Sequence, residues 1–115
     1  MTHVHIKGPL LSISGYGVHA RQVARWAFSK DFHVTVDITP WGSTPWYTDR
    51  EECGGLINQI MEASRPITSK PDYSFQIMLP NEWQPTLARK NFGMSAVVET
   101  DICSKEWVKA CQRMD

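Results

Sequence analysis

Hydrophobic residues recur along this chain with two periods, and the two periods alternate. Residues 3–10 alternate loosely between polar and apolar side chains, which predicts a first strand that runs into a glycine loop. From 18 to 29 the apolar residues return at steps of three and four, which predicts a helix with one buried face. Residues 33–38 are β-branched at alternate positions and predict a second strand.

The second half of the chain repeats this alternation. Thr48 or Asp49 can cap a helix whose core stripe consists of Cys53, Leu56, Ile57, Ile60 and Met61. The pair Gly54-Gly55 costs roughly 1 kcal/mol per glycine in a helix, which favours a later start. The remaining predicted elements are a strand at 73–79, a short helix at 85–90, a strand at 94–98 and a last helix that Ser104 caps.

Strict alternation of strands and helices is typical of a parallel sheet with helices on both faces, here a Rossmann-like α/β sheet of about four strands. With the second strand on one side of the first and the third on the other, the switch point falls between strands one and three. Ligands bind at the carboxyl ends of the strands beside such a point. In this chain those ends are the loops at 15–17, 80–83 and 99–101.

Composition narrows the classes of partner. The chain has 115 residues, which make one domain, and its 12 basic residues balance 12 acidic ones. A neutral chain has no general attraction for nucleic acid or an anionic membrane. No apolar run approaches the ~20 residues that span a bilayer, and the first residues do not resemble a secretory signal. Three widely spaced cysteines without a C-x-x-C pair favour reduced thiols in a cytoplasmic protein, and we expect no cofactor.

A glycine-rich turn precedes the first predicted helix, where Gly15 and Gly17 flank Tyr16. Backbone N–H groups and the helix dipole at such a point can bind a phosphate or another oxyanion. His19, one turn further, could donate a hydrogen bond to the same anion. The alternative is a turn that only joins the strand to the helix.

Carboxylates and tryptophans in loops are the other candidates for chemistry. Carboxylates that follow strands suit general acid–base catalysis or the binding of sugar hydroxyls, and they occur at Glu82, Glu99 and Asp101. Asp101 can instead cap the last helix. Tryptophans that can stack on a sugar or fill the edge of the core occur at Trp41, Trp46 and Trp83.

Two further patterns argue for other ligands. His3 and His5 share one face of the first strand, at a spacing that could hold a metal ion. The sequence indicates no third ligand to complete such a site, so we expect no metal site. Asp37 ends the second strand, where dinucleotide-binding folds carry an acidic ribose ligand. Ala20 takes the place of the third glycine of that motif, which disfavours a small dinucleotide-dependent oxidoreductase.

Three motifs, taken in order, resemble the N-terminal domain of group 1 glycosyltransferases of the GT-B fold. They are G-Y-G-V-H-A-R at 15–21, the tripeptide Asn81-Glu82-Trp83, and the segment 93–115 with E-T-D-I-C at 99–103 followed by E-W-V at 106–108. The resemblance spans 6–115, nearly the whole chain.

The resemblance implies a retaining enzyme with two Rossmann-like domains that face a cleft and often need no metal. The N-terminal domain would bind a sugar or glycoconjugate acceptor, and the C-terminal domain would bind the nucleotide-sugar donor. The glycine loop would approach the diphosphate of the donor, with the loop at 81–83 beside it. Many relatives carry a catalytic histidine that has no counterpart here, so Glu99 or Asp101 is expected to take part of its role.

In this interpretation residues 1–115 are the acceptor-side domain, truncated before the donor domain. We expect such a fragment to transfer no sugar alone, and to form a homo-oligomer through the strand edge and apolar surface left near the last helix. The alternative is a stand-alone sugar- or nucleotide-binding module, or an interaction module, of the same fold. A reading frame that continued past Asp115 into a second α/β domain would favour the transferase.

Overall fold

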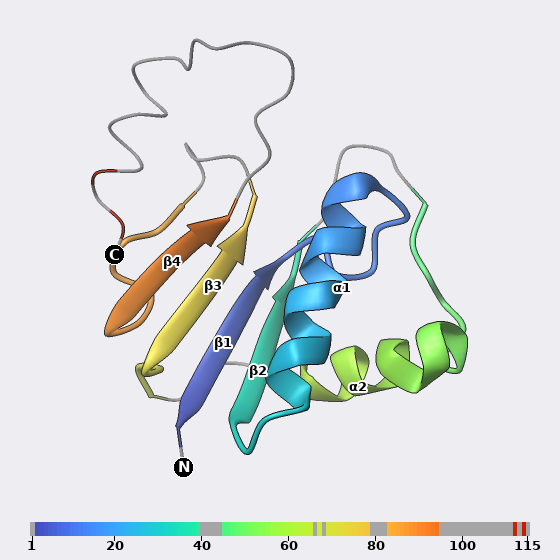
Figure 1. Ribbon diagram of the computed structural model, residues 1–115, viewed down its shortest axis with the longest axis horizontal. Coiled ribbons are helices and arrows are strands. Elements are labelled where there is room, and N and C mark those ends of the chain that lie inside the picture. The colour runs from blue at the N-terminus through green and yellow to red at the C-terminus, as the bar shows by residue number, and fades with distance from the viewer. Residues whose placement is uncertain are drawn as a thin grey trace, which may run out of the picture.

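A computed structural model describes residues 2–39, 45–65, 67, 69–78, 83–94, 112 and 114. Its elements, in chain order, are β1 (His3–Gly8), α1 (Gly15–Phe28), β2 (His33–Ile38), the 3-10 helix η1 (Glu52–Gly55), α2 (Leu56–Ala63), β3 (Tyr73–Ile77) and β4 (Lys90–Met94) (Figure 1). The strands form one parallel, four-stranded sheet in the order β2-β1-β3-β4. The predicted Rossmann-like α/β class and the switch point between β1 and β3 are confirmed.

The sheet has one apolar face and one polar face, because successive side chains of a strand point to opposite sides. Val4 and Ile6 of β1 are fully buried on the apolar side, in one cluster with the residues of α1 that contact the sheet. Those helix residues are small, Ala20, Ala24 and Ala27, and small side chains allow the helix axis to approach the strands closely.

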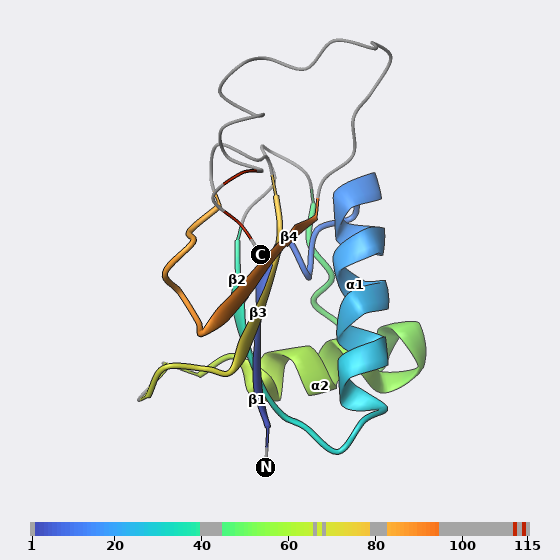
Figure 2. The same ribbon diagram turned by 60° about the vertical axis from the view of Figure 1, so that its left-hand side comes forward.

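Both described α-helices lie on the apolar side of the sheet, where α1 runs alongside the strands and packs against β1 and β3, and α2 packs against β2 and α1 (Figure 2). Helices had been expected on both faces, but among the described residues no helix covers the polar face. Gln84 and Leu87 lie there instead, together with Ser64, Arg65 and Ile67 after α2. Among the described residues, no helix has the length and apolarity needed to cross a membrane.

The region before β4 differs most from the prediction. The short helix expected at 85–90 is absent; residues 85–89 form turns and bends, and β4 begins at Lys90, earlier than the predicted start at 94, while residues 95–98 of the predicted strand lie outside the described residues. The reason is the side chain of Asn91, which accepts a hydrogen bond from the Ala88 N–H (2.8 Å) and donates to the carbonyls of Pro85 (2.7 Å) and Ala88 (2.8 Å). These bonds replace those that a helix would have made within the backbone.

The observed bounds of other elements differ from the predicted ones by a few residues. β1 ends at Gly8 and β3 at Ile77, earlier than the predicted ends at 10 and 79. The helix after the glycine pair starts late, as expected: α2 begins at Leu56, and Gly54 and Gly55 both have positive φ. Only glycine adopts this conformation without strain, so the pair forms the turn into α2.

The glycine turn before α1 is already part of the helix, since α1 begins at Gly15. Ser14 is its N-cap and accepts a hydrogen bond from the Gly17 N–H at 3.1 Å. The buried guanidinium of Arg21 donates to the carbonyls of Leu10 (3.2 Å) and Ser12 (2.6 Å), and so holds the chain after β1 against the helix. A Cβ at position 17 would overlap the Ser12 carbonyl oxygen and lie 2.9 Å from the Ser12 carbonyl carbon.

Replacement of Gly17 by alanine should therefore destabilise the fold. We expect Gly17→Ala to lower the free energy of unfolding by about 2 kcal/mol or more, because the new methyl group meets backbone atoms. The matched control is Gly15→Ala, where a Cβ would meet no atom within 4 Å and should raise stability by roughly 0.5–1 kcal/mol. Urea unfolding measures both, and equal stability of the two variants would contradict the close packing at Gly17.

Candidate functional site

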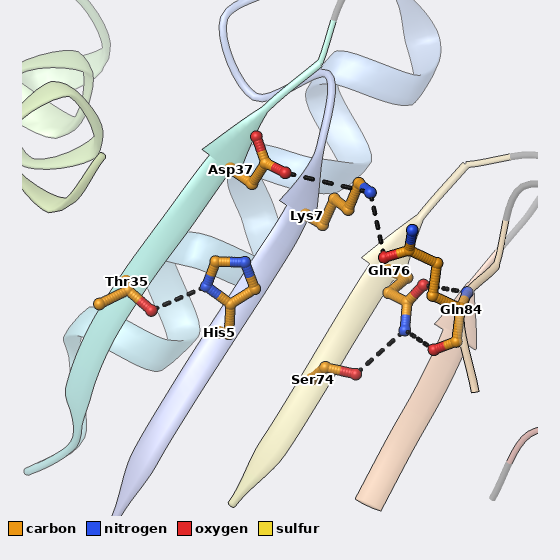
Figure 3. A network of polar contacts seen from close by, with 7 residues as sticks. All are labelled: His5, Lys7, Thr35, Asp37, Ser74, Gln76 and Gln84. Carbon is orange, nitrogen blue, oxygen red and sulfur yellow. Dashed lines mark hydrogen bonds and ion pairs between the residues drawn. The ribbon is translucent and has the colours of Figure 1, made fainter. Parts of the chain in front are cut away.

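The polar face of the sheet holds a hollow of about 480 Å³ near the carboxyl ends of β1 and β2. We call it the polar hollow; its polar lining consists of His5, Lys7, Asp37, Ser64, Arg65 and Gln84. Two of these residues are neighbours by strand register, because Lys7 of β1 pairs with Asp37 of β2. The fold therefore brings together side chains from four separate segments of the chain. Figure 3 shows His5, Lys7, Asp37 and Gln84 from three of them.

The floor of the polar hollow is a chain of hydrogen bonds from His3 through Thr35 to His5. The hydroxyl oxygen of Thr35 lies 2.7 Å from His5 Nδ1 and 2.8 Å from His3 Nε2. A hydroxyl has one proton, so Thr35 donates to one ring and accepts from the other. His5 is 2% exposed, and its second ring nitrogen, Nε2, bonds none of the described residues.

Burial lowers the pKa of His5 from 6.5 to about 4, and the nearby positive charge of Lys7 and the His3 ring act in the same direction. The Asp37 carboxylate opposes this shift without reversing it. His5 is therefore neutral at pH 7 and carries one N–H, on Nδ1 or on Nε2. The pKa of His3 is also lowered, chiefly by burial and then by the neighbouring His33.

The mouth of the polar hollow carries a cation between two acceptors. Lys7 Nζ donates a hydrogen bond to Gln84 Oε1 at 3.3 Å and lies 4.0 Å from Asp37 Oδ2. The Asp37 side chain is 54% exposed, so this ion pair contributes little to stability. Its groups are consequently available to a ligand at little cost to the fold.

Gln84 reaches this position because the segment before β4 is bound to the sheet. The side chain of Gln76 accepts a hydrogen bond from the Gln84 N–H at 2.6 Å and donates to the Gln84 carbonyl at 2.7 Å. Its amide thus pairs with the loop as a neighbouring strand would. Ser74 accepts from Gln76 Nε2 (3.1 Å) and donates to Asn91 Oδ1 (2.7 Å), so that the buried polar side chains of β3 and β4 form one connected network.

The arrangement is suited to binding rather than to a recognisable bond-breaking reaction. The polar hollow offers an ammonium, a guanidinium, a carboxylate, an amide and an imidazole. Within the described residues, no three histidine, cysteine or acidic side chains lie close enough together to hold a metal ion. Such a set can recognise a small polar molecule through several hydrogen bonds at once.

The glycine turn that the sequence indicated lies at the N-terminus of α1, on the other side of the sheet from the polar hollow. Two of its backbone donors are used within the helix cap, since Gly17 N–H bonds Ser14 Oγ and Val18 N–H bonds the Ser14 carbonyl. Tyr16 is half-buried against the core, and His19 is half-buried on α1.

Most of the remaining predicted site residues fall beyond what the structure describes. Asn81, Glu82, Glu99 and Asp101 lie outside the described residues, as does Trp41. Trp83 is described, and its ring packs where a Cβ of Gly93 would be, with its Nε1 buried and without a hydrogen-bond partner. Trp46 is 40% exposed beside the chain that follows β1.

Sequence reasoning missed most of the polar hollow. Asp37 was considered only as a ribose ligand and His5 only as a metal ligand, while Lys7, Thr35 and Gln84 were not singled out. One signal was available: β1 and β2 both place polar residues at alternate positions, and so does β3 with Ser74 and Gln76. Polar residues that share one face of neighbouring strands indicate a face that requires hydrogen-bond partners.

Comparisons of this chain with protein-family models, with curated proteins and with solved structures find no match.

The lowered pKa of His5 predicts that stability falls in mild acid. The unfolded chain binds a proton at this histidine below pH 6.5, whereas the folded chain binds it only near pH 4. The contribution of His5 to the free energy of unfolding is therefore fully present above pH 6.5 and is lost as the pH falls from 6.5 to 4. The loss should be on the order of 3 kcal/mol at pH 4. His5→Asn, which can keep the bond to Thr35 but cannot titrate, should flatten the dependence measured by urea unfolding from pH 7 to 4. His19→Asn is the control, and an unchanged slope in His5→Asn would contradict the assignment.

The pairing of Gln76 with Gln84 makes a separate prediction. Gln76→Leu removes both hydrogen bonds while keeping similar volume, and should lower the free energy of unfolding by about 1–3 kcal/mol because partly buried loop groups lose their partners. Amide exchange of Gln84 should accelerate at the same time. Gln59→Leu, at an exposed position of α2, should change neither quantity. Unchanged exchange at Gln84 in Gln76→Leu would show that other contacts hold the loop.

Proposed function

We propose that this domain binds a small, hydroxyl-rich ligand of the sugar class in the polar hollow. The observation that carries the proposal is the position of Lys7 Nζ, 3.3 Å from Gln84 Oε1 and 4.0 Å from Asp37 Oδ2. Neighbouring hydroxyls of a sugar ring both donate and accept hydrogen bonds. A carboxylate, an amide and an ammonium so close together match that alternation.

The size and the apolar part of the lining support the same class of ligand. A volume of about 480 Å³ lies within the usual range for small-molecule sites. Ile67 and Leu87 also line the polar hollow, and they offer contact area to the C–H groups of a sugar ring. The polar hollow includes the carboxyl end of β1, which is one of the two strands beside the switch point where open α/β sheets commonly bind ligands.

The resemblance to N-terminal domains of group 1 glycosyltransferases supports a sugar as the ligand, because those domains bind a sugar or glycoconjugate acceptor. In this proposal the chain is the acceptor-binding part of such an enzyme, and sugar transfer requires a donor domain. A stand-alone sugar-binding module would use the same polar hollow. The two differ in one consequence, since only the first requires a nucleotide-sugar donor.

Titration followed by NMR tests the proposal directly. We expect monosaccharides, sugar phosphates or nucleotide sugars to shift the backbone amide signals of Lys7 and Asp37 and the side-chain amide signal of Gln84. Asp37→Asn should weaken binding about tenfold, because a hydrogen bond to a charged acceptor is lost.

The matched control is Asp31→Asn, at an exposed position after α1, which should leave the affinity unchanged. Absence of shifts at millimolar concentrations of every probe would overturn the proposal. Shifts confined to Gly15, Tyr16 and Gly17 would transfer the site to the N-terminus of α1.

A further inference from the structure

We infer that the ligand of the polar hollow carries a phosphate monoester, bound by the side chains of Lys7 and Arg65 and by the Nε2–H group of His5. The inference rests on the proposed sugar-binding function and narrows its ligand to a phosphorylated sugar. Three features of the polar hollow support it independently of one another.

The first feature is charge. Lys7 and Arg65 are cations and Asp37 is the single anion among the described residues of the lining, which leaves one net positive charge in a confined space. Lys7 Nζ lies 4.0 Å from Asp37 Oδ2, whereas Arg65 forms no ion pair with any described residue. A partly enclosed site attracts a ligand of the opposite sign more strongly than an open surface does.

The second feature is the geometry of Arg65. Its Nε donates to the Glu62 carbonyl at 3.0 Å, which fixes one edge of the guanidinium at the end of α2. No described residue bonds the two terminal nitrogens. A guanidinium held in this way presents a planar pair of donors, a shape that fits two oxygens of a phosphate.

The third feature is an unused hydrogen-bonding atom on the floor. His5 is 2% exposed, and its Nε2 has no partner among the described residues. Figure 3 shows that the ring nitrogen not bonded to Thr35 lies on the side of the ring nearer Lys7. His5 Nε2 is not among the fully buried polar atoms that lack a partner, so it remains accessible from the polar hollow, where a ligand atom can bond it.

Thr35 determines whether this atom donates or accepts. When the Thr35 hydroxyl accepts from His3 Nε2 and donates to His5 Nδ1, the proton of His5 lies on Nε2 and is directed into the polar hollow. That tautomer suits an anionic oxygen. Thr35 is thus a positioning residue, and it acts on the ligand only through His5.

Calorimetric titration of the full 115-residue chain with glucose, glucose 6-phosphate and inorganic phosphate tests the inference. We expect the sugar phosphate to bind at least tenfold more tightly than either of the other probes. Lys7→Met and Arg65→Met should each remove most of the preference for sugar phosphate over sugar. Lys30→Met, at an exposed position beyond α1, should leave that preference intact.

The role of Thr35 has its own readout. Thr35→Val should lower the affinity for the phosphorylated probe more than for glucose, and Thr35→Ser, which restores the hydroxyl, should recover it. If Thr35→Val does not fold, its NMR spectrum will show this. The affinities of Thr35→Ser and Arg65→Met for glucose 6-phosphate and for glucose then test the inference in its place. Equal affinity of Thr35→Val and the parent for glucose 6-phosphate would overturn this role.

The outcomes separate the inference from the proposed function. Equal binding of glucose and glucose 6-phosphate would overturn the inference and leave the sugar site in place. Equal binding of glucose 6-phosphate and inorganic phosphate, with no binding of glucose, would overturn both, because the sugar would then contribute nothing.

Discussion

The burial of polar side chains on one face of the sheet is the constraint on which the rest of this structure depends. Ser74, Gln76 and Asn91 are almost completely inaccessible to solvent, and a buried polar group without a partner costs about 1–3 kcal/mol. Their partners come from one another and from the backbone of residues 84–88. A loop rather than a helix therefore lies over this face, since a helix would have used its own backbone groups internally.

The candidate site is the place where this network of internal partners ends. Over β3 and β4 the side-chain amides bond the loop, and among the described residues the one buried side-chain atom there without a partner is Nε1 of Trp83. Over β1 and β2 the described part of the loop contributes the side chains of Gln84 and Leu87, and one ring nitrogen of His5 has no partner among the described residues. The polar hollow is thus a region in which the sheet presents polar groups that the described part of the chain does not satisfy, and such regions favour a polar ligand.

At the glycine turn of α1 the sequence suggested a ligand site, whereas the structure shows packing within the protein. Its pattern is compatible with an anion site, but the structure uses Gly17 to bring the helix against the Ser12 carbonyl and uses Arg21 to bind the same chain segment. A glycine that permits close packing and a glycine that admits a ligand have the same sequence signature. The contacts around the missing Cβ distinguish them, and those contacts come from residues earlier in the chain.

Local patterns in the sequence determined the class of fold, the bounds of β2 at His33–Ile38, the helix α1 and the late start of α2 after the glycine pair. These features depend on side-chain periodicity and on the conformational freedom of glycine, which act within a few neighbouring residues. Tertiary structure alone decided the position of β4, the absence of a helix at 85–90 and the composition of the polar hollow. Each of these depends on partners distant in sequence: Lys7 and Gln84 are 77 positions apart, and His5 and Thr35 are 30 apart. Strand order and register bring such residues together, and no local pattern of hydrophobic and polar positions specifies which distant side chains will meet.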